Sequence, residues 1–179
     1  MRESGRVVEA SSTVVLIRAG EEHVIVDTGS SAKLSLLRQK LDLLPLAAED
    51  VQMVVNTHLH ADHCGGNDIF TEAVSVAHSL EDPPVGTRRV TEGTSLLKGV
   101  DVLETPGHTL GSITILVDAD RRYAICGDAI PTKANYDTHT PPAIHVDRRL
   151  AIESMDRILA QAEVVVPGHD APFPVMGKR

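Results

Sequence analysis

The 179-residue sequence is poor in aromatic side chains, with two Tyr, two Phe and no Trp. A site that stacks nucleobases or large aromatic ligands depends on such side chains, so we expect a small, aliphatic substrate. The apolar runs are much shorter than a membrane-spanning segment, and the first residues lack the apolar core of a secretory signal. We therefore expect no membrane association and a cytoplasmic location.

Cysteine and basic clusters are also scarce. Cys64 and Cys126 are too few for the disulfide framework of a small secreted domain, so we expect them to be small buried side chains. The net charge is −8 at pH 7, and the sequence contains no long run of Lys and Arg. This composition argues against a nucleic-acid partner. It leaves open whether the chain forms a homo-oligomer.

The length and the 42% apolar content predict one globular domain spanning residues 1–179. Leucines at helical spacing follow Ser31 until Pro45, and a second helical pattern follows Asp147. We expect residues 81–100 to be mostly loop, with at most one weak strand, and residues 129–147 to be irregular. Strands are predicted at 12–18 and 23–27, which we expect to form a hairpin, and at 51–57, 74–78, 101–105, 112–117, 122–126 and 164–166. Strands alternating with helices are typical of a layered α/β domain.

The segment Thr57–His63 places four metal-ligand side chains, His58, His60, Asp62 and His63, directly after an apolar strand. Three imidazoles and a carboxylate this close together favour a bound cation, because it gives every lone pair a partner. On an extended chain His58 and His60 point the same way and can share one ion. Asp62 and His63 follow at a predicted turn into a helix, where they can reach a second ion.

Three more candidate ligands, His108, Asp128 and His169, each follow an apolar strand and a glycine. A glycine immediately before the ligand permits close backbone approach, and strand ends are rigid platforms for a site. Each motif is weak evidence alone, but their combination behind the first motif predicts a metal centre.

Together these motifs resemble those of the metallo-β-lactamase superfamily. The similarity extends to small single-domain members, such as metallo-β-lactamase domain-containing protein 1, and to lactonase-like hydrolases. It implies an αββα four-layer sandwich with two metal ions at the edge between its sheets. The residues that carry the resemblance are Asp27-Thr28-Gly29, Thr57–His63, Thr105–Ser112, Gly127-Asp128 and Pro167-Gly168-His169.

The resemblance also implies how the ligands divide between the ions. His58, His60 and His108 would hold one ion; Asp62, His63 and His169 would hold the other; Asp128 would bridge them. Zinc is the first expectation for both divalent ions, with iron or manganese as alternatives, because this donor set suits all three.

The implied activity is hydrolysis of a small ester, thioester or lactone by a hydroxide that bridges the metals. Asp62 and Asp128 would orient the nucleophile, and Tyr136, in a substrate wall formed by residues 129–146, would donate a proton or a hydrogen bond to the oxyanion. Asp27, Thr57 and Thr109 would support the ligands. Two alternatives stay open: a phosphodiesterase or ribonuclease with the same metals, and a mononuclear iron oxygenase of the persulfide dioxygenase type.

Overall fold

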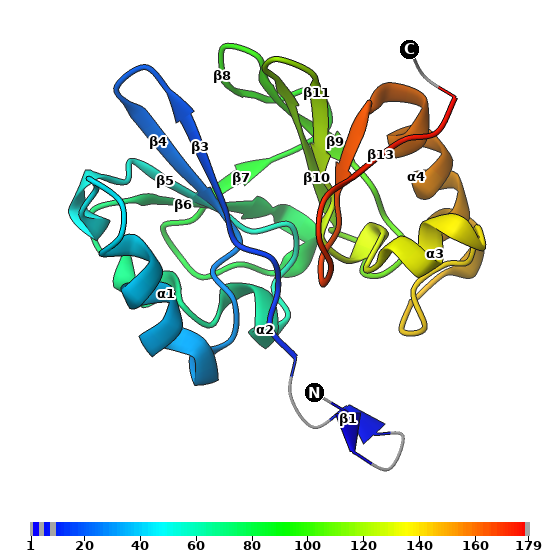
Figure 1. Cartoon of the computed structure of the whole chain (residues 1–179), viewed down its shortest axis with the longest axis horizontal. Helices are drawn as coiled ribbons and strands as arrows, with labels where there is room; N and C mark the ends of the chain where they lie inside the picture. The colour runs from blue at the N-terminus through cyan, green and yellow to red at the C-terminus, as the bar shows by residue number, and fades with distance from the viewer. Residues whose placement is uncertain (1, 4–5, 8–9, 178–179) are drawn as a thin grey trace.

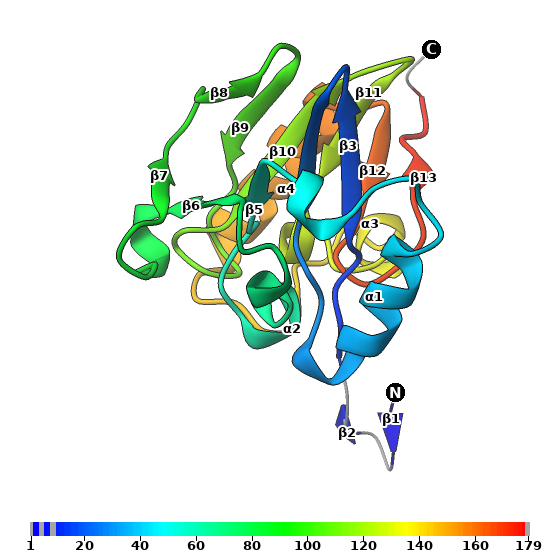
Figure 2. The same cartoon turned by 90° about the vertical axis from the view of Figure 1, so that its left-hand side faces the viewer.

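A computed structural model of the chain describes residues 2–3, 6–7 and 10–177. Two β-sheets face each other, and helices cover the outer surface of each (Figure 1). Helix α1 lies on one side, and α4 is seen behind the strands in the rotated view of Figure 2. This arrangement confirms the predicted αββα sandwich. None of the described helices is long and apolar enough to cross a membrane.

The first sheet has five strands in the order β3-β4-β5-β6-β7. The predicted hairpin near its start is confirmed, because β3 and β4 pair in antiparallel fashion. The strands are β3 (Val15–Ala19), β4 (Glu22–Val26), β5 (Met53–Val55), β6 (Val74–His78) and β7 (Arg88–Val90). The helices between them are η1 (Ser31–Lys33), α1 (Leu34–Leu41), η2 (Ala48–Asp50), α2 (Ala61–Cys64), η3 (Asn67–Ile69) and η4 (Ser79–Glu81).

The second sheet has six strands in the order β13-β12-β11-β10-β9-β8. They are β8 (Ser95–Leu97), β9 (Val100–Glu104), β10 (Ile113–Asp118), β11 (Arg122–Ile125), β12 (Val164–Val166) and β13 (Phe173–Pro174). The helices are η5 (Gly127–Ala129), α3 (Lys133–Asp137) and α4 (Arg148–Gln161). A separate pair of two-residue strands, β1 (Arg2–Glu3) and β2 (Arg6–Val7), precedes both sheets.

Several short elements differ from the sequence prediction. Residues 81–100 hold two strands, β7 and β8, rather than at most one, and β13 follows the last predicted strand. Helix α3 lies in the segment predicted to be irregular, where Thr132 caps it by accepting a hydrogen bond from Asn135 N–H. These elements have two to five residues, too few for either periodicity to be legible.

The core is divided into three layers by the alternation of side chains along each strand. In β4, Val24 and Val26 point into the space between the sheets, while Ile25 points outward to the cluster with Leu37 and Leu41 of α1. This is the period of two that strands impose. The second sheet behaves alike: Ile125 faces the other sheet, and its neighbours pack under α4.

The strands that precede the candidate ligands end at one edge of the sandwich. Strands β4 and β5 are parallel, as are β11 and β12, so within each pair the carboxyl ends lie side by side. At this edge Ile113 N–H donates to the Thr57 carbonyl at 2.8 Å, which joins the two sheets. The polar residues that follow these strands are therefore brought together.

Helix α4 packs closely against the turn that precedes His108. Gly107 has φ +139°, and a Cβ atom there would collide with the backbone of Ala151 in α4. The Gly107 carbonyl also accepts a hydrogen bond from Val146 N–H at 2.8 Å. Glycine is therefore required at 107 by a close contact as well as by its backbone conformation.

We predict that Gly107→Ala destabilises the fold more than Gly20→Ala does. Both glycines have positive φ, but a Cβ at Gly20, in the β3–β4 turn, would meet nothing within 4 Å. The difference combines the steric clash with α4 and the less accessible φ at 107, for which we expect about 1–3 kcal/mol of unfolding free energy. Denaturant unfolding of both variants measures it, and equal losses would contradict the close packing described above.

Candidate metal centre

The structure brings the seven candidate ligands together at the sheet edge. Within each of three groups the ligand atoms all lie within 4.8 Å of one another. The groups are His58, His60 and His108 (the first triad); Asp62, His63 and His169 (the second triad); and His58, His63 and Asp128.

The first triad converges on the His60 ring. Nε2 of His58 lies 3.0 Å from His60 Nδ1, and Nε2 of His108 lies 2.9 Å from the same atom. His58 and His108 are buried, whereas His60 is exposed. The first triad therefore has one face open to solvent.

The second triad is built on α2, whose four residues carry Asp62 and His63. His63 Nε2 lies 3.4 Å from His169 Nε2, and Asp62 Oδ2 lies 3.6 Å from the same His169 nitrogen. The loop-to-helix turn expected from the sequence thus places both side chains toward the end of β12.

Asp128 lies between the two triads. Its Oδ1 is 3.1 Å from His169 Nε2 and 3.4 Å from His63 Nε2, while its Oδ2 is 3.6 Å from His108 Nε2. Each oxygen of this carboxylate thus faces a different triad. Such a position suits a ligand that two ions share.

Hydrogen bonds on the outer side of the rings orient four of the five histidines. In each, Nδ1 contacts an oxygen of a supporting group, so the neutral ring keeps its Nε2 lone pair for the centre. For His58, His63, His108 and His169 in turn, the partners are Thr57 Oγ1 (3.2 Å), Asp27 Oδ2 (2.7 Å), the Ile144 carbonyl (2.7 Å) and the Ser11 carbonyl (3.1 Å).

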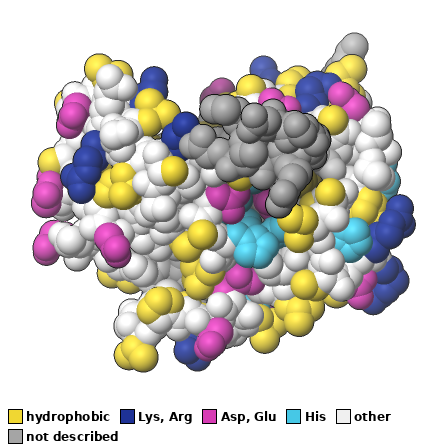
Figure 3. All heavy atoms as spheres, turned by 90° about the horizontal axis from the view of Figure 1, so that it is seen from below, with side chains coloured by type: hydrophobic (Ala, Val, Ile, Leu, Met, Phe, Trp, Pro, Cys, Tyr) yellow, Lys and Arg dark blue, Asp and Glu magenta, His cyan; other side chains and the backbone are white. Residues whose placement is uncertain are grey.

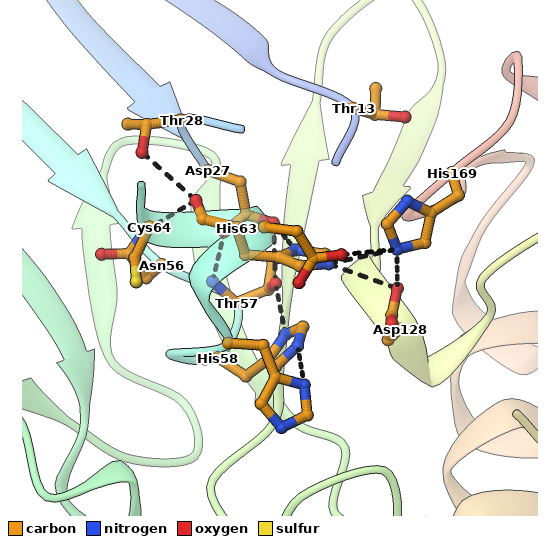
Figure 4. A network of polar contacts seen from close by, with 12 residues as sticks. Thr13, Asp27, Thr28, Asn56, Thr57, His58, His63, Cys64, Asp128 and His169 are labelled. Carbon is orange, nitrogen blue, oxygen red and sulfur yellow. Dashed lines mark hydrogen bonds and ion pairs between the residues drawn. The ribbon is translucent and has the colours of Figure 1, made fainter. Parts of the chain in front are cut away.

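Asp27 joins two of these supports. Its Oδ1 accepts from Thr57 N–H at 2.8 Å, and its Oδ2 accepts from the Thr57 hydroxyl at 2.8 Å and from His63 Nδ1–H. Figure 4 shows His63 between Asp27 on one side and Asp128 and His169 on the other. Asp27 and Thr57, expected to support the ligands, thus contact His63 and His58.

The charges of the buried rings differ. Burial, with help from the neighbouring His63, lowers the pKa of His58 to about 2, so this imidazole is neutral. Burial also opposes a proton on His63, but Asp27 and Asp128 outweigh it and raise its pKa to about 10. The neighbouring Asp128 carboxylate raises the pKa of His169. Without a cation, protons therefore occupy the centre beside Asp128.

The donor set fits a divalent cation. Asp128 Oδ1 is buried and accepts no hydrogen bond from the described chain, although two imidazole nitrogens lie near it. Buried polar atoms are normally satisfied, and a cation satisfies the carboxylate and the imidazole lone pairs at once. Imidazoles with carboxylates suit zinc, iron or manganese.

Gly168 shows why a glycine precedes a ligand here. A Cβ at this position would collide with Asp128 Oδ1 and with the backbone of Gly127. The loops that carry Asp128 and His169 therefore touch directly, and this contact needs a residue without a side chain.

In the expected substrate wall, Tyr136 and Lys133 bond to residues that are not candidate ligands. The Tyr136 hydroxyl accepts from Met176 N–H at 2.9 Å, and its ring packs 4.9 Å from that of Phe173. Lys133 pairs with Asp137 of its own helix. Tyr136 belongs to none of the candidate ligand groups of the described chain, and its catalytic role stays a prediction.

Two supports were missed by the sequence analysis, the carbonyls of Ser11 and Ile144. A backbone carbonyl has no side-chain identity, so no residue pattern could have indicated them. Thr109, expected to support a ligand, instead bonds through its hydroxyl to Ser112 and Glu81.

Comparisons with known proteins agree with this geometry. A profile of the metallo-beta-lactamase superfamily matches residues 7–85 and 79–169. The chain is 36% identical over 172 residues to a protein of Methanocaldococcus jannaschii named "Probable metallo-hydrolase", covering 95% of this chain and 82% of that one. It is 33% identical to mouse metallo-beta-lactamase domain-containing protein 1, covering 94% of this chain and 67% of that protein.

Solved structures share the fold. A Thermotoga maritima protein assigned to the metallo-beta-lactamases superposes with a TM-score of 0.81 at 22% identity, covering 97% of this chain and 93% of that one. An N-acyl homoserine lactone hydrolase superposes with a TM-score of 0.75 at 22% identity, covering 87% and 79%. With a family profile that spans most of the sequence and relatives above 30% identity, the chain belongs to the metallo-beta-lactamase superfamily and is a metal-dependent hydrolase.

Proposed function

We propose that this hydrolase holds two divalent ions, zinc in the first place, and cleaves a small aliphatic ester, thioester or lactone. The position of Asp128 supports the binding of two ions, because its two oxygens face different triads. A single-ion site would need only one of the triads.

When bound, such ions lower the pKa of water and polarise a substrate carbonyl. Asp128 is buried, which opposes its ionisation, but His169 and His63 hold its pKa well below the usual range. It therefore stays a carboxylate that orients rather than takes up a proton. Asp62 is partly exposed beside His169 and is the better placed of the two to accept a proton from water.

Exposed aliphatic side chains lie in the two segments that adjoin His108. Leu110, Ile144 and Val146 are 55%, 73% and 62% exposed. Ile144 supplies the carbonyl that orients His108, and Val146 N–H bonds to Gly107. Seen from below, the surface of the molecule has hydrophobic side chains beside histidines (Figure 3). An acyl chain could make apolar contacts with these three side chains. A phosphodiester would gain nothing from them, because none of the three is basic.

Lactonases among the relatives support the same substrate class. An N-acyl homoserine lactonase of a Bacillus species is 29% identical over 143 residues, covering 68% of this chain and 57% of that enzyme. The solved lactone hydrolase described above carries its product, N-hexanoyl-L-homoserine, at the catalytic metal centre.

A substrate panel tests the proposal. Zinc-loaded protein is assayed with acyl lactones, aliphatic thioesters and bis-p-nitrophenyl phosphate, and iron-loaded protein is assayed for oxygen uptake with persulfides. We expect turnover of the carbonyl substrates only. Preferred cleavage of the phosphodiester, or oxygen consumption, would replace the proposal with the corresponding alternative.

We predict that Asp128→Ala abolishes turnover and lowers the metal content below two ions per chain, because both triads lose their common carboxylate. Asp137→Ala is the control, since Asp137 is an exposed carboxylate that pairs with Lys133. Elemental analysis and steady-state kinetics measure the two effects. Two tightly bound ions in an active Asp128→Ala protein would disprove the bridging role.

We also predict that Ile144→Glu raises KM for lactones with long acyl chains more than for short ones, with little change in kcat. The substitution leaves the backbone carbonyl that orients His108 in place. Leu43→Glu is the matched control, because Leu43 is equally exposed, at 73%, and follows α1 on the outer side of the first sheet. An unchanged dependence of KM on chain length would rule out the apolar contact.

A further inference from the structure

We propose that Glu81 is a positioning residue that holds the first triad, a role that rests on the proposed dinuclear function. Glu81 is the last residue of η4, after β6, and is partly buried. It is not one of the candidate ligands of the described chain. Its carboxylate instead connects the two loops that carry His58, His60 and His108.

One carboxylate oxygen holds the first loop. Glu81 Oε2 accepts a hydrogen bond from Leu59 N–H at 2.9 Å. Leu59 lies between His58 and His60 in the chain, so this bond fixes the peptide that separates the two rings. His58 precedes this peptide and His60 follows it, so the position of the peptide affects the orientation of both imidazoles.

The other oxygen holds the second loop. Glu81 Oε1 accepts from the Thr109 hydroxyl at 2.6 Å and from Gly111 N–H at 3.1 Å. Because the Thr109 hydroxyl donates to Glu81, it accepts in turn from the buried Ser112 hydroxyl at 2.7 Å. Thr109 directly follows His108, so Glu81 fixes the loop beside the third ring of the triad.

The absence of a side chain at Gly111 is a separate sign of this contact. A Cβ there would lie 2.7 Å from Glu81 Oε1 and 2.9 Å from its Cγ. Atoms do not approach this closely without displacement, so an alanine would push Glu81 away. The loop after His108 is therefore shaped to receive this carboxylate.

Only a carboxylate satisfies this arrangement. All three partners donate, so both oxygens must accept. A glutamine keeps the size of the side chain but directs its amide N–H groups at one of the two loops. The matching carboxylate on the other side of the centre is Asp27, which reaches the second triad through His63 and the first through Thr57.

The experiment measures stepwise metal affinity of the whole chain by competition with a chelator, using Zn²⁺ and Co²⁺. We expect Glu81→Gln to weaken one of the two bound equivalents about 10–100-fold and to leave the other unchanged. His60 belongs only to the first triad, so the Co²⁺ absorption band that disappears in His60→Ala reports the ion held there. We expect the ion that Glu81→Gln weakens to be the one that gives this band.

Glu92→Gln is the matched control. The Glu92 carboxylate also joins separate segments, accepting from Glu104 N–H at 2.6 Å and pairing with Arg157 at 2.8 Å, but it contacts no candidate ligand. We expect it to lower the unfolding free energy of the metal-free protein without changing either metal affinity. Gly111→Ala, which retains Glu81 but displaces it, should reproduce the Glu81→Gln result even if Glu81→Gln fails to fold.

The outcomes separate this inference from the proposed function. If the parent binds two ions and Glu81→Gln and Gly111→Ala weaken both equally or neither, Glu81 does not position the first triad. If the parent binds only one ion, the dinuclear function is refuted. The role of Glu81 then stands only if both Glu81→Gln and His60→Ala weaken that ion.

Discussion

The buried Asp27 carboxylate and its three donors hold the ends of β4 and β5 in the geometry on which the metal centre depends. Three hydrogen bonds of 2.7 to 2.8 Å, two from Thr57 and one from His63, satisfy this carboxylate. A buried charge without them would cost several kcal/mol. The backbone at Asp27 has φ +55°, a conformation uncommon outside glycine. The donors therefore secure a strained residue as well as two neighbouring candidate ligands.

The rest of the fold supplies a rigid edge to which these loops are attached. Parallel pairing aligns the ends of β4 with β5 and of β11 with β12. The bond from Ile113 N–H to the Thr57 carbonyl ties one sheet to the other. The interior between the sheets is lined mainly by valine and isoleucine side chains from both of them.

Residue types and spacing predicted the parts of the structure that depend on local pattern. The hairpin, the helix capped by Asp147 and the layered fold were of this kind. So was the gathering of ligands after strands, since each lies within a few residues of a recognisable apolar run. The motif at Thr57–His63 and the glycine before His169 can be recognised from the sequence alone.

What could not be predicted depends on contacts between distant segments. Glu81 lies in a region without periodicity, and its partners, Leu59 and Thr109, donate from far along the chain. The group that orients His108 is the backbone carbonyl of Ile144, and every residue type has such a carbonyl, so the sequence gives no sign of it. Nor could the sequence show that the Tyr136 hydroxyl accepts from Met176 N–H and that its ring packs against that of Phe173. Tyr136 lies in α3, a helix of five residues, which is too short for its periodicity to be recognised in the sequence.

The dispersal of the ligands along the chain has a thermodynamic consequence. The candidate ligands lie in four separate segments, at 58–63, 108, 128 and 169, which must fold before their lone pairs converge, so an unfolded chain offers no comparable site. A cation that binds only the native state adds to its stability in proportion to the logarithm of its free concentration. The lifetime of this protein in a cell is thereby linked to metal supply, and starvation for the ion would reduce the amount of folded enzyme as well as its activity.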